Sequence, residues 1–371
     1  MLDTVGAPSR SGSAGFVEGD NVISGSGGGT VSYFGDVSSY AICGCCGRFH
    51  AVSDGTGDGQ GVLLNGDDRG GFGPNGKTSF SVTDAGIQLT RNSDGWSGVV
   101  GGAATVTFAF RNTAPGTMPS DTGGFSQFSN LQINATLLAL AAWSDVANVT
   151  FQRVNDGAGY SNNATILFSN FSTGSDGAAA FAYLPGNAST SSNSGDVWIN
   201  NTLSYNATPV ILGYGQQVLL HEIGHAIGLS HPAAYNASAG GSITYANDAV
   251  YFEDSRQYSV MSYFSETNTG GDYLTGGGTR QYAAAPMLDD IAGAQRLYGA
   301  NMGTRTGDTV YGFNSTAGQP WFSANTTSAL IFAVWDAGGT DTFDFSGYAM
   351  GQTIDLRQGA FSNVGGLVGN V

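Results

Sequence analysis

Three of the chain's four histidines lie close together, at His221, His225 and His231. Positions four apart share one face of a helix, so the first two can present ring nitrogens to one metal ion at the distance of about 2.0–2.1 Å typical of zinc. Gly228 permits the positive φ that ends a helix, and the reversed chain can bring back the third histidine. Three protein ligands leave one position open for water, which is typical of a catalytic zinc site.

Glu222 directly follows the first histidine, so on a helix it projects beside the metal and not onto it. Zinc lowers the pKa of bound water to about 7, and a carboxylate within hydrogen-bond reach can take its proton. We therefore predict Glu222 as the general base for attack of hydroxide on a polarised peptide carbonyl. A helix with ordinary polar histidines explains this five-position pattern poorly.

Three helices are predicted around this chemistry. The histidines fall on a helix over residues 215–228. Before it, Ser129 can cap a helix whose apolar positions follow the 3.6-residue period to Trp143. After it, a helix begins at Pro286, carries two aspartates in its first turn and is followed by Gly299.

Strand signals surround these helices. In residues 105–110 Val106, Phe108 and Phe110 share one face, as in a half-buried strand. Strands around well-formed helices predict an α+β fold with a mixed sheet. Shorter apolar runs predict further strands at 149–151, 165–168 and 179–184.

Composition divides the chain into three segments. Residues 1–76 are rich in Gly and Ser without a sustained apolar period, which predicts a leader or propeptide. Residues 77–300 contain the elements described above and form the predicted zinc protease domain. Residues 301–371 change to short strands joined by Asp and Gly turns, which predicts the start of a second, all-β unit.

Asp and Glu outnumber Lys and Arg by 28 to 12, for a net charge of -16. A nucleic-acid partner is not expected, because phosphate binding needs clustered basic residues. The carboxylates fit either bound calcium or solubility alone. No apolar run approaches about 18 residues, so no membrane insertion is expected. The first twenty residues lack the regions of a cleaved secretory signal, so no N-terminal signal peptide is expected.

The chain's three cysteines are Cys43, Cys45 and Cys46. Because they lie together, they exclude a disulfide framework as the source of stability. His50 is near enough in sequence to suggest a structural zinc site, but the spacing fits none of the common zinc motifs. We expect a thiol cluster without metal.

Met261 lies 30 residues after His231, within residues 259–264. The extended histidine motif followed by such a methionine is the signature of the metzincin proteases, in which it forms the Met-turn. The chain resembles, more narrowly, the serralysin family of bacterial metalloendopeptidases over roughly residues 77–371. The matching segments are 88–91, 143–148, 221–232, 247–251, 261–263, 286–291, 305–314 and 335–347.

The resemblance implies roles that spacing alone does not show. Tyr263 is expected to ligate the one catalytic zinc ion in the resting enzyme and to swing away to hydrogen-bond the developing oxyanion. Met261 is expected to form an apolar floor beneath the ligands. An extended polypeptide substrate is expected to add to an edge strand through backbone groups. That strand comprises Ala180, Phe181, Ala182 and Tyr183.

The resemblance also implies several structural calcium ions at the entry to a parallel β-roll. The family's repeated Gly-Gly-x-Gly-x-Asp motifs do not appear before residue 371, so we expect only the start of the roll. We expect a secreted, monomeric protein whose one-step export signal lies beyond this sequence. The expected calcium ligands are carbonyl groups at Arg305, Gly307 and Thr309, together with Asp336, Gly338, Gly339 and Asp341.

Two alternatives stay open at this point. The Gly, Asn, Asp and Thr content also fits a non-enzymatic, calcium-dependent adhesin or matrix protein, against which the intact set of zinc-site residues weighs. The second alternative is a zinc peptidase in which a distant glutamate is the third ligand. His231 makes such a glutamate unnecessary.

Overall fold

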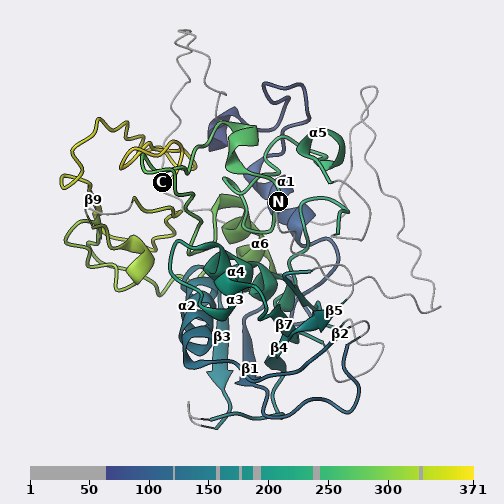
Figure 1. The fold of residues 1–371 in the computed structure, drawn as a ribbon. Coiled ribbons are helices and arrows are strands. Elements are labelled where there is room, and N and C mark those ends of the chain that lie inside the picture. Colours follow the sequence, from purple (N-terminus) through teal and green to yellow (C-terminus); the bar gives the residue numbers. More distant parts are fainter. Residues whose placement is uncertain are drawn as a thin grey trace. The chain divides into compact units, whose positions relative to one another are not determined.

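The computed structural model describes seven stretches of the chain, all within one compact unit (Figure 1). The cysteine cluster, His50 and most of the predicted leader lie outside them. The described residues are 64–119, 122–155, 159–174, 178–186, 194–236, 243–325 and 329–371.

The largest sheet among the described residues has five strands, and it is mixed, as predicted. Four strands run parallel, and β6 pairs antiparallel with β7 and forms one edge of the sheet. The strands lie in the order β3 (Val149–Arg153), β1 (Ala104–Phe110), β4 (Ile166–Phe171), β7 (Val197–Asn200) and β6 (Ala180–Ala182). Two short strands, β2 (Thr122–Gly123) and β5 (Thr173–Gly174), pair separately.

The alternation predicted for β1 holds as far as Phe108, and Ala109 is buried as well. Val106, Phe108 and Phe110 are all buried in the main core, where Phe110 packs against Phe128 and Phe168. A smaller core of Phe171, Phe181 and Trp198 lies apart from it. The sheet is therefore fixed by apolar burial at several points along its strands.

Helices α2 (Asn130–Val146) and α4 (Tyr214–Ala226) pack on each other, and α2 also contacts β3 while α4 contacts β6. Ser129 caps α2 in a capping box with Gln132, which confirms the predicted start of that helix. Trp143 joins the two helices, because its indole donates a hydrogen bond to the carbonyl of Leu220 at 3.1 Å.

The predicted third helix is α6 (Leu288–Tyr298), which begins two residues after Pro286 and ends before Gly299. It packs against α1 (Val82–Leu89), a helix that the sequence patterns did not predict. A Cβ on Gly86 of α1 would lie 3.0 Å from the backbone of Ala292, so this glycine allows the close approach of the two helices. The remaining short helices are α3 (Ser204–Ala207), α5 (Tyr245–Asp248), η1 (Gly66–Asp68), η3 (Glu266–Thr269) and η4 (Pro320–Phe322).

The described part of the predicted leader, residues 64–76, contacts the rest of the unit. The hydroxyl of Tyr258 exchanges hydrogen bonds with both backbone groups of Leu64. Arg69 forms a buried two-point ion pair with Asp289 on α6, with distances of 2.6 and 2.9 Å. The leader boundary at residue 76 stays a prediction, but residues 64–69 are anchored to the folded unit.

In the C-terminal segment, β8 (Val310–Gly312) and β9 (Thr342–Asp344) pair in parallel. Parallel pairing across the 29-residue connection from 313 to 341 is what the start of a β-roll requires. Within the part of the chain that the structure describes, none of the helices is sufficiently long and apolar to cross a membrane.

Candidate metal centre and active site

His221, His225 and His231 meet at one point beside α4. Their Nε2 atoms form a triangle in which every pair lies 3.1 Å apart. Nitrogens that bind one zinc ion in near-tetrahedral geometry at about 2.0–2.1 Å lie roughly 3.3–3.4 Å apart. Among the described residues, these histidines are the only group of three His, Cys, Asp or Glu ligand atoms this close together.

The other ring nitrogen of each histidine contacts a backbone carbonyl. The Nδ1 atoms donate to the carbonyls of Val260, Leu229 and Tyr235, at 2.9, 2.7 and 2.7 Å respectively. A carbonyl can only accept, so each Nδ1 carries the proton and each Nε2 directs a lone pair toward the centre of the triangle. Three converging lone pairs fit a metal cation.

Burial keeps these imidazoles neutral. It lowers the pKa of His221 and of His231 well below the ordinary value, and lowers the pKa of His225 to about 4. Neutral imidazole is the form that binds a metal, so at neutral pH the site needs to release no proton from these rings.

The turn after α4 brings the third histidine back. Gly228 has φ of 112°, as predicted for the residue that ends the helix. The amide of Leu229 bonds to the carbonyl of Gly224 at 2.9 Å, and that of Gly228 bonds to the carbonyl of His225 at 2.9 Å. This pair of bonds is a Schellman motif, which reverses the chain toward His231.

Glu222 is fully buried beside the triad, and neither carboxylate oxygen has a hydrogen-bond partner among the described residues. Burial raises the pKa of this carboxyl well above its ordinary value. A buried carboxylate without protein partners must be satisfied by something else, and water held at the metal is the partner that its position favours.

Met261 lies directly under α4. A Cβ on Gly224 would lie 2.4 Å from its sulfur and 3.1 Å from the Trp143 ring, so the helix approaches the methionine closely because this position is glycine. Tyr263, two residues on, packs its ring on the site, with its centroid 4.5 Å from that of His231 and 5.9 Å from that of His221.

Asp254, which no sequence pattern indicated, links the third histidine to the Met-turn. The hydroxyls of Tyr235 and Ser262 both donate to its Oδ1, at 2.8 and 2.6 Å. Burial raises the pKa of Asp254 to about 7, and its Oδ2 has no partner among the described residues. Only tertiary contact reveals this role, because nothing in the spacing of Asp254 distinguishes it from other acidic residues.

Comparison with known proteins agrees with this geometry. Residues 106–272 match a family model described as metallo-peptidase family M12, and residues 300–371 match one described as peptidase M10 serralysin C terminal. The chain is 50% identical over 314 residues to serralysin C of Dickeya chrysanthemi, covering 83% of this chain and 63% of that protein. It is 48% identical over 309 residues to metalloprotease AprA of Pseudomonas entomophila, covering 82% of this chain and 62% of that protein.

The chain is similar to serralysins over most of its length. It is also 47% identical to a serralysin of Photorhabdus over 270 residues, with 72% of this chain and 53% of that protein covered. The chain spans about three fifths of the length of serralysin C and of metalloprotease AprA.

Two loops of the C-terminal segment meet where calcium was predicted. A Cβ on Gly339 would lie 2.6 Å from the backbone of Gly307, so the loops are in contact. The carboxylate of Asp341 accepts from the Thr309 amide at 3.0 Å, and burial followed by neighbouring carboxylates raises the pKa of Asp341. Asp308, which is not among the predicted calcium ligands, lies in the same place and accepts a hydrogen bond from the Thr340 amide at 2.8 Å.

The other predicted calcium residues flank this contact. Asp336 accepts hydrogen bonds from the Gly338 amide at 2.9 Å and from the Tyr311 hydroxyl at 2.5 Å. The side chain of Arg305 forms a two-point ion pair with Asp145 of α2, at 2.6 and 2.8 Å, so any part in calcium binding falls to its backbone carbonyl. The calcium assignment stays a prediction.

The predicted substrate strand coincides with β6. Ala180, Phe181 and Ala182 are buried, Tyr183 is half-buried, and the strand lies at the edge of the sheet. An edge strand keeps one side unpaired within its own sheet, which is what strand addition requires. The edge strand lies close to the three histidines, because β6 packs on α4.

Proposed function

We propose that the chain is a zinc-dependent endopeptidase that hydrolyses extended polypeptides outside the cell. The observation that carries this proposal is the triangle of His221, His225 and His231 with the unpartnered Glu222 carboxylate beside it. The family names of the relatives support the reaction class, and the resemblance supports an extracellular site of action.

The residues present fit a zinc ion. Nε2 atoms of the three histidines would hold it, and when bound it would supply a Lewis acid that polarises the scissile carbonyl and acidifies water. Glu222 takes the proton of the attacking water and returns it to the leaving amine. Tyr263 donates a hydrogen bond to the oxygen that becomes negative, and Met261 supports the ligands from below. Backbone groups of β6 hold the substrate in extended form.

We also propose the calcium ions and the monomeric state expected above. The loops of residues 305–309 and 336–341 meet with carbonyls and carboxylates at hand, which are the ligands that calcium prefers. These ions would hold the C-terminal unit together and take no part in hydrolysis.

Digestion of casein by the purified chain tests the activity. We expect hydrolysis that stops with a zinc chelator and returns when zinc is added back. Elemental analysis is expected to give one zinc per chain, with the site lost in His225→Ala. Full hydrolysis with no bound metal would overturn the proposal. An inert chain with its zinc in place would favour the non-enzymatic alternative.

A further inference from the structure

A small pocket lies next to the metal centre. Its volume is about 10 Å³, room for roughly one water molecule. One wall is the first turns of α4 up to His221, and the opposite wall includes Arg256 and the Met-turn. The lining residues are Tyr214, Gln217, Val218, His221, Arg256, Ser262 and Tyr263.

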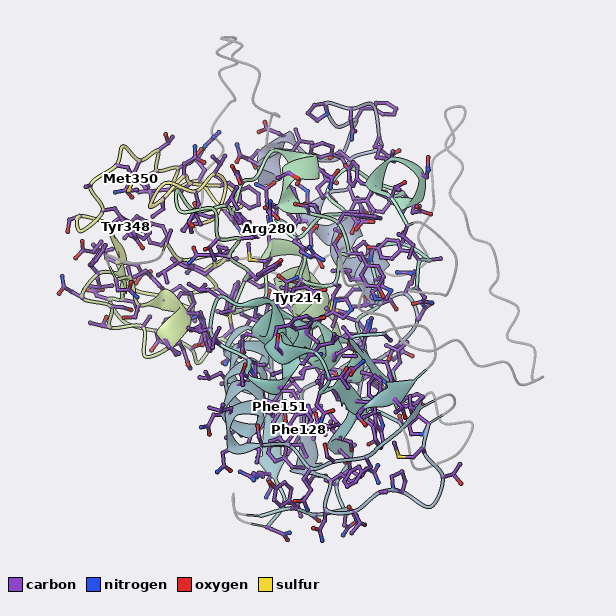
Figure 2. The ribbon with its side chains drawn as sticks, viewed as in Figure 1. Phe128, Phe151, Tyr214, Arg280, Tyr348 and Met350 are labelled. Atoms are coloured by element: carbon purple, nitrogen blue, oxygen red, sulfur yellow. The ribbon has the colours of Figure 1, made fainter. Side chains whose placement is uncertain are left out.

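Arg256 is the only charged side chain among the residues that line this pocket. Its residue is 6% exposed, and its guanidinium lies over the rings of Tyr214 and Tyr282, 5.6 and 5.9 Å from their centroids. Tyr214, labelled in Figure 2, is the first residue of α4. The two rings lie 5.0 Å apart and so hold the arginine in place.

No carboxylate of the described residues lies within 4.0 Å of the Arg256 guanidinium, and its Nε has no hydrogen-bond partner there. Other buried arginines of the chain differ in this respect. Each forms an ion pair with an aspartate: Arg69 with Asp289, Arg111 with Asp196 and Arg305 with Asp145.

A buried cation without a counter-charge is costly, and contact with aromatic rings offsets only part of that cost. The positive charge of Arg256 therefore lies beside the proposed reaction centre without a protein anion to neutralise it. A substrate that brings a carboxylate into the pocket would supply the missing partner through the paired donors of the guanidinium.

We propose that Arg256 is a specificity-determining residue that binds a carboxylate of the substrate next to the scissile bond. This inference rests on the proposed peptidase function. Because the pocket is small, it favours the shorter of the two acidic side chains, that of aspartate. The terminal carboxylate of a peptide cut one residue from its end offers the same chemistry from another source.

Peptides that differ only in Asp or Asn on either side of the cleaved bond isolate the charge. We expect kcat/KM at one of these positions to be at least about tenfold higher for Asp, which corresponds to a charged hydrogen bond. The ratio of kcat/KM for the Asp peptide to that for the Asn peptide is expected to fall to about one in Arg256→Met. In Arg256→Lys we expect a ratio between that value and the wild-type value. Arg153→Met is the matched control, because Arg153 also stacks on a ring, that of Phe110, and does not line the pocket. It should keep the full preference.

A second pair of short peptides, ending in a free carboxylate or an amide, shows whether the terminal group is recognised instead. Equal cleavage of the Asp and Asn peptides and of the acid and amide peptides by the wild-type protein would overturn the inference. An Arg256→Met variant that retains the preference would overturn it as well. Absence of all cleavage, by contrast, would count against the proposed function.

Binding of non-cleavable Asp and Asn peptides to the zinc-loaded protein, measured by calorimetry, tests the carboxylate contact without turnover. We expect tighter binding of the Asp peptide, with a difference that shrinks at high salt because salt screens the charge. If Arg256→Met does not fold, the salt dependence measured on the wild-type protein still tests the contact. Equal affinities for the two peptides, or a difference in affinity that does not change with salt, would refute it.

Discussion

At the scale of single residues, the proposed mechanism assigns metal binding and proton transfer to different side chains. The histidines are neutral, and their orientation is fixed by carbonyls, whereas Glu222 is buried without a protein partner. Substitution of one group can therefore leave the other in place. This separation makes the proposed mechanism testable residue by residue.

Glu222→Gln keeps the side-chain volume and removes the base. We expect bound zinc and fold to persist and turnover to fall by about 10² to 10⁴. Tyr263→Phe should cost less, because it removes one hydrogen-bond donor and leaves proton transfer intact. Peptidase assays normalised to bound zinc give the order of the two losses. Near-normal turnover in Glu222→Gln would falsify the assignment of the base.

Asp254 gives the stability of the fold a pH dependence. Its pKa is raised from 3.8 to about 7, so this group's contribution is fully present below about pH 4 and is lost as pH rises through 7. Asp254→Asn resembles the protonated form at every pH. We expect the wild type to lose at least about 1 kcal/mol more unfolding free energy than Asp254→Asn between pH 5 and 8. Denaturant titrations at both pH values measure this, and parallel pH curves would contradict it.

At the scale of elements, strong local signals predicted the structure and weak ones did not. The cap at Ser129, the alternation in β1 and the histidine helix needed no tertiary information. Helix α1 was missed because it is short and contains Gly86, and its contacts with α6 stabilise it. Strand β7 was missed because its short buried run lacks alternation.

The candidate site divides in the same way. Spacing on α4 predicted that the three histidines converge and that Gly228 turns the chain, and both features are present. Asp254 and Arg256 could not be found, because their significance depends on what surrounds them after folding. A lone aspartate or arginine has no period and no motif, and an unpaired buried charge is visible only in three dimensions.

Gly224 lets α4 approach the Met-turn. In Gly224→Ala the new methyl group would meet the buried Met261 sulfur at 2.4 Å, so we expect a loss of about 1–3 kcal/mol and weaker zinc binding. Gly293→Ala on α6 is the control, since its Cβ would meet nothing closer than 3.5 Å. Thermal unfolding and chelator competition compare the two. Equal stabilities of the Gly224→Ala and Gly293→Ala variants would show that the Met261 side chain moves aside without a cost in free energy.

At the scale of the whole molecule, contacts distant in sequence hold the catalytic region. Leu64 and Asn65 bond to Tyr258 and to the Phe361 amide, and Arg69 pairs with Asp289 in the first turn of α6. The ion pair of Arg305 with Asp145 links the C-terminal segment to α2. The Met-turn, which follows Tyr258 by three residues, is thereby tied to both ends of the described chain.

Removal of calcium tests the C-terminal loops. Ligand binding to the folded state stabilises it, and without cations the carboxylates of Asp308, Asp336 and Asp341 repel one another. We expect a calcium-selective chelator to lower the thermal midpoint by about 5 °C and to leave bound zinc unchanged. An identical midpoint in excess calcium and in chelator would mean that these loops bind none.

The backbone acceptors of the three histidines have a consequence for how this site tolerates mutation. A carboxylate that orients a metal ligand is lost by one nucleotide change, but a main-chain carbonyl survives any substitution of its own residue that keeps the backbone path. Conservative replacements at Val260 and Leu229 should therefore leave all three imidazoles aligned. The orientation of the ligands is inherited with the fold, so the surrounding side chains are free to diversify substrate preference while the metal geometry persists.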